Sequence, residues 1–526
     1  MKKAQKDWLL FLYCLLVAAV CLLLCSKSSP LYPINDWTDA NAYLSCGKGM
    51  LNGRVMYRDL YEHKGPLLYA LHALCCLIDS GSFLGVYFLE TLAGGLFLLT
   101  CYRTLALYGA HKAALPALPI LAALVYTSVS FQMGDSAEEL CLPMLAWSLY
   151  SLLRWLRQSA PRRMDARSLT VNGLLCGCVL WVKFTMLGFY IPWVLGLMLW
   201  HLLRREWKHA LSVLGWLALG IAVSTIPWLI YFGVNGAILP WLKTYLYDNI
   251  FLYQDAPSLG LIGRLKATVR SAWDWFSTNW AYTAPMTIGF VWITLRAGRK
   301  PSARTGRASG ETPDALSAGG RDAPQSTVPI STAEKLFLWA LMGVAALGVF
   351  IGGKSYVYYG LVLAAFAAVG ALPFCLWLGR ALMCKKALAR VLCVLIALGT
   401  PALCVAASPN AKDMLKPRDQ TMQYQFAAIV NRTPHATLLN YGFMDAGFYT
   451  ACNIAPSVKY FHQTNVHLQD MLDEQARYIA DGVTDYVVTR GKQPESITDR
   501  YELVATADAP ADFWYRQVYL YRRKGL

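Results

Sequence analysis

The sequence reads DWTDANAY over residues 36–43 and GRVMYRDLYEHKGP over residues 53–66, shortly after a strongly apolar run at residues 8–26. The apolar run is long enough to cross a bilayer, so the charged side chains that follow it are expected beside a membrane surface. Ionisable groups next to lipid carry a solvation cost that has to be compensated. The stretch therefore predicts a polar site at the rim of a membrane protein rather than a simple connecting loop.

The composition is that of a polytopic membrane protein. Of the 526 residues, 56% are hydrophobic and only 15% are charged, and the mean hydropathy is +0.36, which is too apolar for an ordinary soluble protein. The net charge of +16 does not indicate a nucleic-acid partner, because the basic residues cluster between apolar runs, where cytoplasmic retention explains them. The 15 cysteines lie mostly inside apolar runs, so no disulfide framework is expected.

The apolar runs predict a topology of about eleven transmembrane helices, each able to cross about 30 Å of hydrocarbon. The predicted spans are residues 8–26, 83–107, 114–131, 138–156, 169–183, 185–203, 209–232, 280–296, 334–352, 355–378 and 388–407. Basic residues follow the even-numbered spans, at 154–167, 204–208, 296–300 and 380–390. The positive-inside rule therefore predicts a multi-pass plasma-membrane protein with a cytoplasmic N-terminus, and it places both residues 26–82 and the C-terminal region outside.

Two domains are predicted. Residues 1–407 form an α-helical polytopic transmembrane domain whose first external loop is 26–82, and residues 408–526 form a small extracytoplasmic α/β domain, because the composition turns polar there. Strands are expected at 437–441, 485–489, 501–505 and 517–521, and helices at 420–431 and 466–481. Residues 299–331, rich in Gly, Ser, Ala, Pro and Arg, are predicted to be a disordered cytoplasmic linker.

Within the first external loop, apolar residues recur at helical spacing from Trp37 to Leu51, and Gly53 follows as a natural stop. This pattern predicts an amphipathic helix lying on the membrane surface. Asp36 is expected to cap that helix. Asp39 remains as the candidate site residue, because further charges follow it close to the same surface.

Two other segments place charge at the outer ends of predicted spans. The turn QMGDSAEE at residues 132–139 has three carboxylates where helix capping requires fewer, which makes Asp135 or Glu138 a candidate site residue. The segment GKSYVYY at 353–359 begins the tenth span, and its Lys354 either balances a phosphate or reaches toward the head groups beside an aromatic belt. For Lys183, in the hairpin between spans five and six, reaching to the interface is the favoured interpretation.

The loop resembles the membrane-embedded glycosyltransferases of the GT-C type, in particular bacterial relatives of the protein O-mannosyltransferases and the aminoarabinose transferases that modify lipid A. The resemblance rests on DANAY at residues 39–43, GRVMYRD at 53–59 and KGP at 64–66, with two weaker motifs at 132–139 and 353–359. It implies that Asp39 is the catalytic carboxylate and that Lys64 contacts a lipid phosphate. Arg58 is expected to assist Lys64.

The same resemblance implies substrate contacts from the other outer segments. Asp135 or Glu138 would help to bind substrate or metal, and Lys354 with Tyr358 would face the lipid-phosphate site. One position departs from the aminoarabinose transferases, which have a metal-binding Glu directly before the Lys, whereas here His63 takes that position and Glu62 precedes it. A divalent ion such as Mg, Mn or Zn, with His63 as a ligand, therefore stays an open expectation.

These features predict the transfer of a sugar from a polyprenyl-phosphate donor to an extracytoplasmic acceptor, because nucleotide sugars are not available outside the cell. The resemblance implies inversion at the sugar carbon. The expected partners are the lipid donor, a cell-envelope glycan, lipid or protein as acceptor, and the bilayer. The alternatives are a transporter or flippase of lipid-linked saccharides, which would place charges near mid-membrane, and an envelope assembly scaffold working through residues 408–526.

Overall fold

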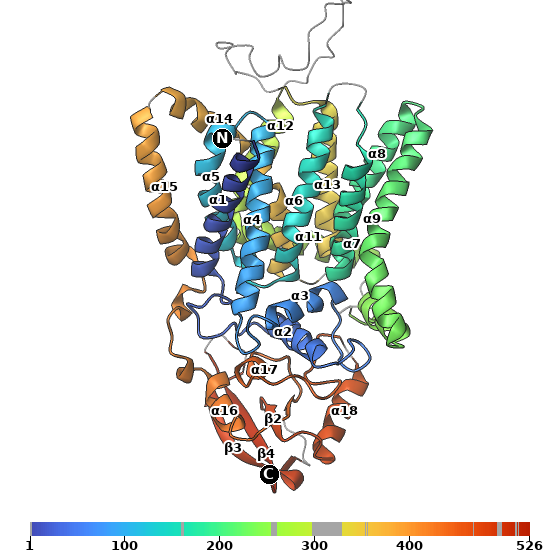
Figure 1. Cartoon of the computed structure of the whole chain (residues 1–526), viewed down its shortest axis with the longest axis vertical. Coiled ribbons are helices and arrows are strands. Elements are labelled where there is room, and N and C mark those ends of the chain that lie inside the picture. Colours follow the sequence, from blue (N-terminus) through green and yellow to red (C-terminus); the bar gives the residue numbers. More distant parts are fainter. Residues whose placement is uncertain are drawn as a thin grey trace, which may run out of the picture.

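The computed structural model describes residues 3–158, 162–253, 260–296, 329–352, 354, 356–384, 386–466, 468–491, 497–510, 513 and 515–526. The predicted linker 299–331 lies outside the described residues except for 329–331. The N-terminal and C-terminal ends lie at opposite ends of the molecule (Figure 1).

A bundle of long helices makes up most of the chain (Figure 1). Its helices are α1 (Lys3–Cys25), α4 (Leu84–Leu107), α5 (His111–Tyr126), α6 (Ala137–Leu156), α7 (Ala166–Val182), α8 (Tyr190–Leu203), α9 (Trp207–Val234), α12 (Trp280–Leu295), α13 (Thr332–Phe350), α14 (Ala367–Cys384) and α15 (Lys386–Ala407). In the described part of the chain, seven helical stretches are long and apolar enough to cross a membrane. The count of eleven spans stays a prediction, because helices such as α5 and α7 are shorter.

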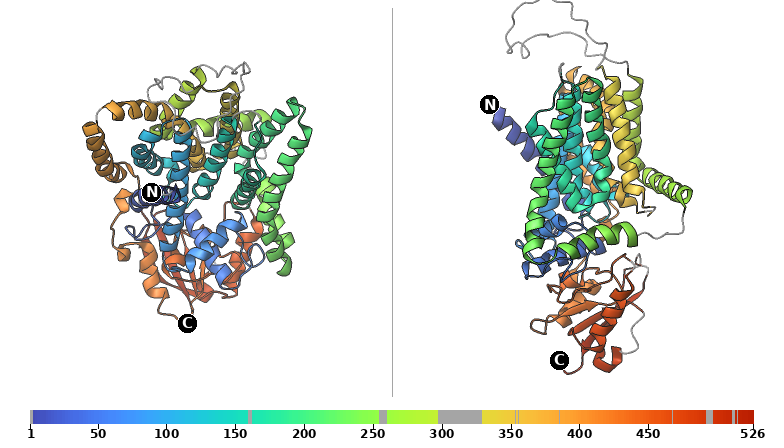
Figure 2. Two further views of the ribbon diagram at one scale, coloured as in Figure 1. Left: turned by 45° about the horizontal axis from the view of Figure 1, so that its top comes forward. Right: turned by 90° about the vertical axis from the view of Figure 1, so that its right-hand side faces the viewer.

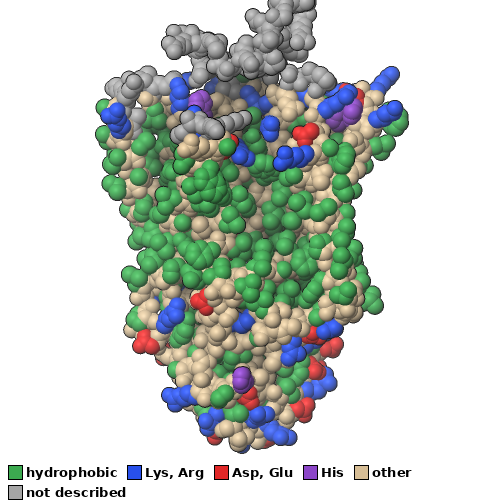
Figure 3. All heavy atoms as spheres, viewed as in Figure 1, with side chains coloured by type: hydrophobic (Ala, Val, Ile, Leu, Met, Phe, Trp, Pro, Cys, Tyr) green, Lys and Arg blue, Asp and Glu red, His purple; other side chains and the backbone are tan. Residues whose placement is uncertain are grey.

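The surface of the bundle is apolar around its middle. Figure 3 shows a band of hydrophobic side chains there, with charged side chains gathered toward both ends of the molecule. Inside the bundle, small residues let backbones approach closely. A Cβ on Gly173 of α7 would lie 2.2 Å from the carbonyl oxygen of Leu217 on α9, and one on Gly220 would lie 2.2 Å from that of Thr170. These glycines fix the contact between α7 and α9.

Short elements cover the end of the bundle that faces the C-terminal part. They are α2 (Thr38–Leu51), α3 (Pro66–Cys76), η2 (Phe184–Phe189), α10 (Ile238–Leu242), the π-helical turn η3 (Lys243–Leu252), α11 (Leu261–Thr278) and η5 (Val357–Phe366), with η1 (Val129–Phe131) in the turn before α6. Figure 2 shows the segment 238–252 crossing this end of the bundle. These elements form the layer in which the sequence motifs of the first loop meet those of the later spans.

The helix predicted from the first loop is present, but its setting differs from the prediction. Residues 39–49 of α2 are buried, because the helix lies between α3 and the C-terminal part instead of on an open membrane surface (Figure 1). Asp36 does not cap it: the N-cap residue is Trp37, and Asp36 accepts a hydrogen bond from Lys27 at 2.8 Å. Lys27 also pairs with Asp413 at 2.7 Å. The Asp36 carboxylate therefore belongs to an ion-pair group around Lys27 and is turned away from the helix.

The C-terminal part contains a four-stranded mixed sheet in the order β1-β2-β4-β3. Its strands are β1 (Leu438–Asn440), β2 (Tyr486–Thr489), β3 (Tyr501–Asp508) and β4 (Gln517–Arg523), and its helices are α16 (Met422–Val430), α17 (Phe448–Ala451), α18 (Gln469–Ala480) and α19 (Ile497–Arg500), preceded by η6 (Ala411–Asp413) and η7 (Arg418–Gln420). Only β1 and β2 pair in parallel. Each strand overlaps a run that was predicted as a strand.

Side-chain contacts attach this part to the first loop. Thr450 donates a hydrogen bond to Asn41 at 2.8 Å, and the buried Lys48 donates one to the carbonyl oxygen of Tyr449 at 3.3 Å. The backbone N–H of Tyr61 donates to the carbonyl oxygen of Lys459 at 2.9 Å. The loop is therefore held between the bundle and the C-terminal sheet.

Candidate functional site

Asp39 lies in the first turn of α2 and is 5% exposed. Its Oδ2 atom accepts hydrogen bonds from the hydroxyls of Tyr43, at 3.2 Å, and Tyr358, at 3.1 Å. Tyr43 is one helical turn further along, and Tyr358 comes from η5, about 320 residues away in the chain. Two tyrosine hydroxyls therefore fix the orientation of one buried carboxylate. The hydrogen bond from Tyr358 also joins the first loop to the segment 353–359, which the sequence motif indicated.

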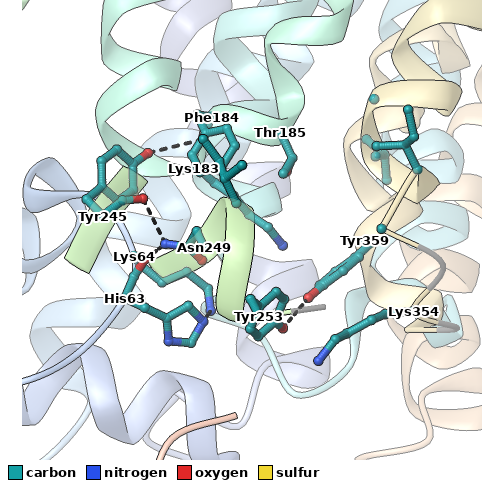
Figure 4. Close-up of a pocket in the computed structure, with 15 residues that line it drawn as sticks. His63, Lys64, Lys183, Phe184, Thr185, Tyr245, Asn249, Tyr253, Lys354 and Tyr359 are labelled. Carbon is teal, nitrogen blue, oxygen red and sulfur yellow. Dashed lines mark hydrogen bonds between the residues drawn. The ribbon is translucent and has the colours of Figure 1, made fainter. Parts of the chain in front are cut away.

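A pocket of about 220 Å3 is lined by Tyr359, the chain neighbour of the Tyr358 that binds Asp39, and by Lys64 (Figure 4). Three lysines from distant parts of the chain line it: Lys64 from the first loop, Lys183 from the junction of α7 and η2, and Lys354 from the segment before η5. The lining also includes His63, Tyr245, Asn249, Tyr253 and Tyr359. A pocket with three ammonium groups suits an anion, since Lys acts as a compact positive point charge.

Lys64 is 6% exposed and is held by its backbone. Its N–H donates to the hydroxyl of Tyr69 at 2.8 Å, and its carbonyl accepts from the hydroxyl of Tyr57 at 2.7 Å. The next residue must be glycine, because a Cβ on Gly65 would lie 2.0 Å from the carbonyl oxygen of Trp181. Burial lowers the pKa of the Lys64 ammonium, but the surrounding acidic groups, Asp39 first and then Tyr253, Glu62 and Glu138, together raise that pKa above its usual value. Lys64 is therefore a fixed cation.

Lys183 belongs to the same pocket. It is paired with the buried Glu138 carboxylate of α6, and its Nζ lies 3.4 Å from the ring centroid of Tyr359. The sequence interpretation of Lys183 as a side chain reaching toward the head groups is wrong, because the side chain is buried and turned inward. Tyr358, which binds Asp39, and its neighbour Tyr359 thus connect the carboxylate with the lysines.

The far wall of the pocket is built from tyrosines. The hydroxyls of Tyr253 and Tyr359 lie 2.9 Å apart, and the ammonium of Lys354 lies 3.8 Å from the ring centroid of Tyr253. On the near wall, Asn249 donates a hydrogen bond to the carbonyl oxygen of His63 at 2.6 Å. Figure 4 shows these side chains around one opening, with Lys64 and His63 on one side and Lys354 on the other.

Comparison with known proteins connects this geometry to a fold. Residues 53–238 match the family model of the dolichyl-phosphate-mannose-protein mannosyltransferases. The crystal structure of ArnT from Cupriavidus metallidurans bound to undecaprenyl phosphate is 13% identical, covers 96% of this chain and 97% of that chain, and superposes with a TM-score of 0.57. The chain has a GT-C fold. No curated protein sequence matches significantly.

A second GT-C relative of known structure is the archaeal oligosaccharyltransferase AglB from Archaeoglobus fulgidus in complex with an inhibitory peptide and a dolichol-phosphate. It is 14% identical, covers 93% of this chain and 70% of that chain, and has a TM-score of 0.50. The resemblance inferred from the first-loop motifs is thereby confirmed at the level of fold. The matched residues 53–238 include Lys64, Glu138 and Lys183 but not Asp39.

Two predicted site residues of the GT-C fold lie away from the pocket. Arg58 is 44% exposed, pairs with Asp59 at 2.8 Å and donates to the carbonyl oxygen of Asn235 at 2.7 Å. Asp135 is fully buried, and both of its carboxylate oxygens face Nε2 of His72, at 2.9 and 3.0 Å. Of the two candidates in the second outer turn, Glu138 is thus the one beside the lysine pocket.

His63 sits in a second group of buried polar side chains. Its Nδ1 is 3.0 Å from Oε1 of Glu62, and Nε2 of His462 is 3.5 Å from the other oxygen of Glu62. These atoms face one another at ion-pair distances, and Glu62 Oε2, His63 Nδ1 and His462 Nε2 have no hydrogen bond besides these contacts. Within the described ranges no group of three or more His, Cys, Asp and Glu residues is arranged to hold a metal ion. One carboxylate and two imidazoles are nevertheless the donor types that zinc and manganese accept.

Several members of the site gave no usable signal in the sequence. His462 stands alone in a polar segment, and Tyr245, Asn249 and Tyr253 lie in a stretch that no motif covers. The positions of Tyr245 and Asn249 depend on the π-helical turn η3, which directs both side chains toward the first loop. The role of Lys183 could have been predicted from the sequence. A lysine between two apolar runs needs a partner of opposite charge, and Glu138 at the start of a neighbouring span is a candidate.

Proposed function

We propose that this protein transfers a sugar from a polyprenyl-phosphate donor to an acceptor hydroxyl at the outer surface of the membrane. The observation that carries the proposal is the buried Asp39 carboxylate beside a pocket lined by Lys64, Lys183 and Lys354. The ligands bound in the two similar structures, undecaprenyl phosphate for ArnT and dolichol-phosphate for AglB, support a lipid phosphate as the anion.

In the proposed complex the donor phosphate occupies the lysine pocket. Lys64 and Lys354 neutralise its charge, and Lys183 adds a third ammonium that Glu138 holds in place. The tyrosine wall contributes hydroxyl donors from Tyr253 and Tyr359. Because these groups are positioned before the substrate arrives, they favour the extra negative charge that the phosphate gains when the sugar leaves it.

The proposed chemistry is a single displacement at the anomeric carbon. The acceptor oxygen forms a bond to that carbon while the bond to the phosphate oxygen breaks, and the electron pair leaves with the lipid phosphate. Asp39, aimed by Tyr43 and Tyr358, orients the acceptor hydroxyl and takes its proton. Attack opposite the leaving phosphate inverts the sugar carbon.

We further propose that a divalent cation binds at Glu62, His63 and His462. These residues bring one carboxylate and two imidazoles together in the buried interior, with the two rings 3.0 and 3.5 Å from the Glu62 oxygens. Bound there, the ion would supply positive charge next to Lys64 and hold the C-terminal part against the first loop. Metal content by plasma mass spectrometry tests this: the wild type should retain about one ion per chain and His462→Ala should lose it, and equal content in both overturns the assignment.

A binding and transfer experiment tests the main proposal. The purified protein in phosphatidylcholine nanodiscs should bind undecaprenyl phosphate, and Lys64→Met should weaken that binding by about a hundredfold, because a charge-assisted contact at a buried site is lost. Lys416→Met, an exposed lysine paired with Asp413, serves as the control. Lipid mass spectrometry of a strain lacking the protein should show a polyprenyl-phosphate sugar accumulating. Unchanged lipids together with no undecaprenyl-phosphate binding would refute the proposal.

A further inference from the structure

A second, larger cleft lies on the other side of η3. Its volume is about 850 Å3, and it opens between the segment 239–247 and the C-terminal part. The lining residues used below are Tyr61, Tyr247 and Tyr460 together with Lys243, Lys459 and Leu239. The sequence analysis predicted no site here, and nothing in the proposed donor chemistry uses these residues.

The cleft and the lysine pocket share a wall. On η3, Tyr245 and Asn249 face the pocket whereas Lys243 and Tyr247 face the cleft. The extended first loop alternates in the same way, because Tyr61 lines the cleft and His63, two residues later, lines the pocket. A molecule in the cleft would therefore lie next to a molecule in the pocket.

Tyrosine rings form the floor of the cleft. The rings of Tyr61 and Tyr460 are 5.5 Å apart, and the Tyr61 hydroxyl donates to the buried Asp248 at 2.9 Å, which fixes its ring. Tyr247 is 51% exposed at the rim. A tyrosine offers an apolar ring face and a hydroxyl at its edge, and this combination packs well against a sugar ring.

Positive charge gathers on one side of the cleft. Lys243 comes from η3 and Lys459 from the C-terminal part, and with the described residues neither side chain forms an ion pair. Both lysines line the cleft, as does the carboxylate of Asp470, and burial together with the like charge of Lys243 lowers the pKa of Lys459 below its usual value. An anionic group between the two lysines would relieve the repulsion of their like charges.

Part of the cleft lining is apolar. Leu239 of α10 is 79% exposed and Leu242 is 38% exposed, and both line the cleft from the segment that crosses the end of the helix bundle (Figure 2). Apolar side chains exposed at this level suit contact with lipid chains. The cleft is therefore matched to a molecule with a charged sugar at one end and a hydrocarbon chain at the other.

We propose that this cleft binds the anionic saccharide head group of a membrane lipid, with the negative charge between Lys243 and Lys459 and the sugar against Tyr61 and Tyr460.

Binding of a defined amphiphile tests the proposal on the full-length protein in phosphatidylcholine nanodiscs, with empty nanodiscs subtracted. Octyl β-D-glucuronide, which has a sugar, a carboxylate and an alkyl chain, is expected to bind. Octyl β-D-glucoside, which lacks the charge, and sodium glucuronate, which lacks the chain, should each bind at least about tenfold more weakly. Glucuronate binding as tightly as the octyl compound would indicate a soluble ligand and overturn the lipid assignment.

Two variants locate the binding. Lys459→Met should weaken octyl glucuronide binding about tenfold, and Tyr460→Ala should weaken both octyl glycosides, whereas Lys416→Met should change neither. Undecaprenyl phosphate binding should persist in Lys459→Met, which shows that the variant is folded. Glucuronide binding that is unchanged in Lys459→Met, or that is lost only in Lys64→Met, would overturn the proposal.

The two proposals fail separately. If the wild type does not bind undecaprenyl phosphate but still binds octyl glucuronide in a manner that depends on Lys459, the donor assignment falls and the cleft assignment stands. If undecaprenyl phosphate binds and octyl glucuronide does not, the donor pocket stands and the cleft assignment falls.

Discussion

Two groups of buried ionisable side chains lie at the same end of the helix bundle, and they differ in whether they enclose a cavity. The first is the lysine pocket, formed by Lys64, Lys183 and Lys354. The second, called here the carboxylate cluster, consists of Glu90, Asp135 and Glu139 with Ser26 and His72. The pocket is lined by three lysines and encloses a cavity, whereas the cluster gathers three carboxyl groups that hydrogen bonds join to one another's backbone and to Ser26 and His72.

Two carboxylates of the carboxylate cluster accept hydrogen bonds from the same backbone N–H, that of Asp135. The N–H of Asp135 donates to Glu90 at 2.7 Å and to Glu139 at 2.9 Å, and the Ser26 hydroxyl also donates to Glu90. Asp135 reaches this position with a φ of 65°. A Cβ at the preceding Gly134, which has a φ of +89°, would lie 2.2 Å from Ser26 Oγ. The cluster thus joins α3, α4, α6 and the end of α1.

The comparison teaches that buried charge alone does not identify a site. Both groups satisfy the expectation that ionisable residues at a membrane rim have a function, but among the described residues the lysine pocket encloses a cavity, whereas the carboxylate cluster closes on itself through hydrogen bonds. The carboxylate cluster is best understood as a clamp. Four predictions test this division.

The largest effect is expected for Asp39→Asn. The proposed base loses its ability to accept a proton, so the rate of sugar transfer should fall by about a thousandfold, while undecaprenyl phosphate still binds. The measurement is single-turnover transfer with saturating lipid donor. Asp135→Asn, which keeps hydrogen-bonding groups in the clamp, should retain the rate of the folded fraction, and a comparable loss there would erase the distinction between the two groups.

Next in size is the loss of stability on opening the clamp. Asp135→Ala leaves the buried His72 without its partner, and we expect a cost of about 3 kcal/mol in the free energy of unfolding. Thermal unfolding in nanodiscs measures it. The same truncation at Asp413, which is part-exposed, serves as a comparison and should cost less. No change in the unfolding midpoint of Asp135→Ala would contradict the clamp.

The ion pair between Lys183 and Glu138 provides a test of the lysine pocket. Removing both charges in Lys183→Met/Glu138→Gln leaves no unpaired buried ion, so stability should change little. Undecaprenyl phosphate binding should weaken about tenfold, because the phosphate loses one of three ammonium groups. Equilibrium binding of the double variant checks this, and wild-type affinity would show that Lys183 serves Glu138 alone.

The smallest effect concerns pH. The Asp135 carboxylate outweighs burial and raises the pKa of His72 above its usual 6.5, so the folded state holds this proton more tightly than the unfolded state does. The resulting stabilisation is fully present below pH 6.5 and is lost as the pH rises through the folded pKa. We expect a fall of about 2 °C in the unfolding midpoint over that range, and a flatter profile for His72→Gln. A wild-type midpoint that rises with pH would contradict the assignment.

Much of this arrangement follows from the sequence. The apolar runs, the helix between Trp37 and Leu51, the strands of the C-terminal part and the candidates Asp39, Lys64 and Lys354 were all predicted, because hydrophobic periodicity and local motifs depend on neighbouring residues. The roles of Asp36, Asp135 and Lys183 were misjudged or left open. Asp135 and Lys183 are decided by partners far away in the chain, His72 and Glu138. Asp36 is decided by the nearby Lys27, whose other partner, Asp413, is far away.

The sequence by itself thus determined which residues are charged, where the long apolar runs lie and which charged segments follow them. Only the tertiary structure decided which of those charges neutralise one another and which converge on open space. The physical reason is that Coulomb and hydrogen-bond energies depend on distance and on the exclusion of water, and both are set by helix packing and by the turn of η3 instead of by spacing along the chain.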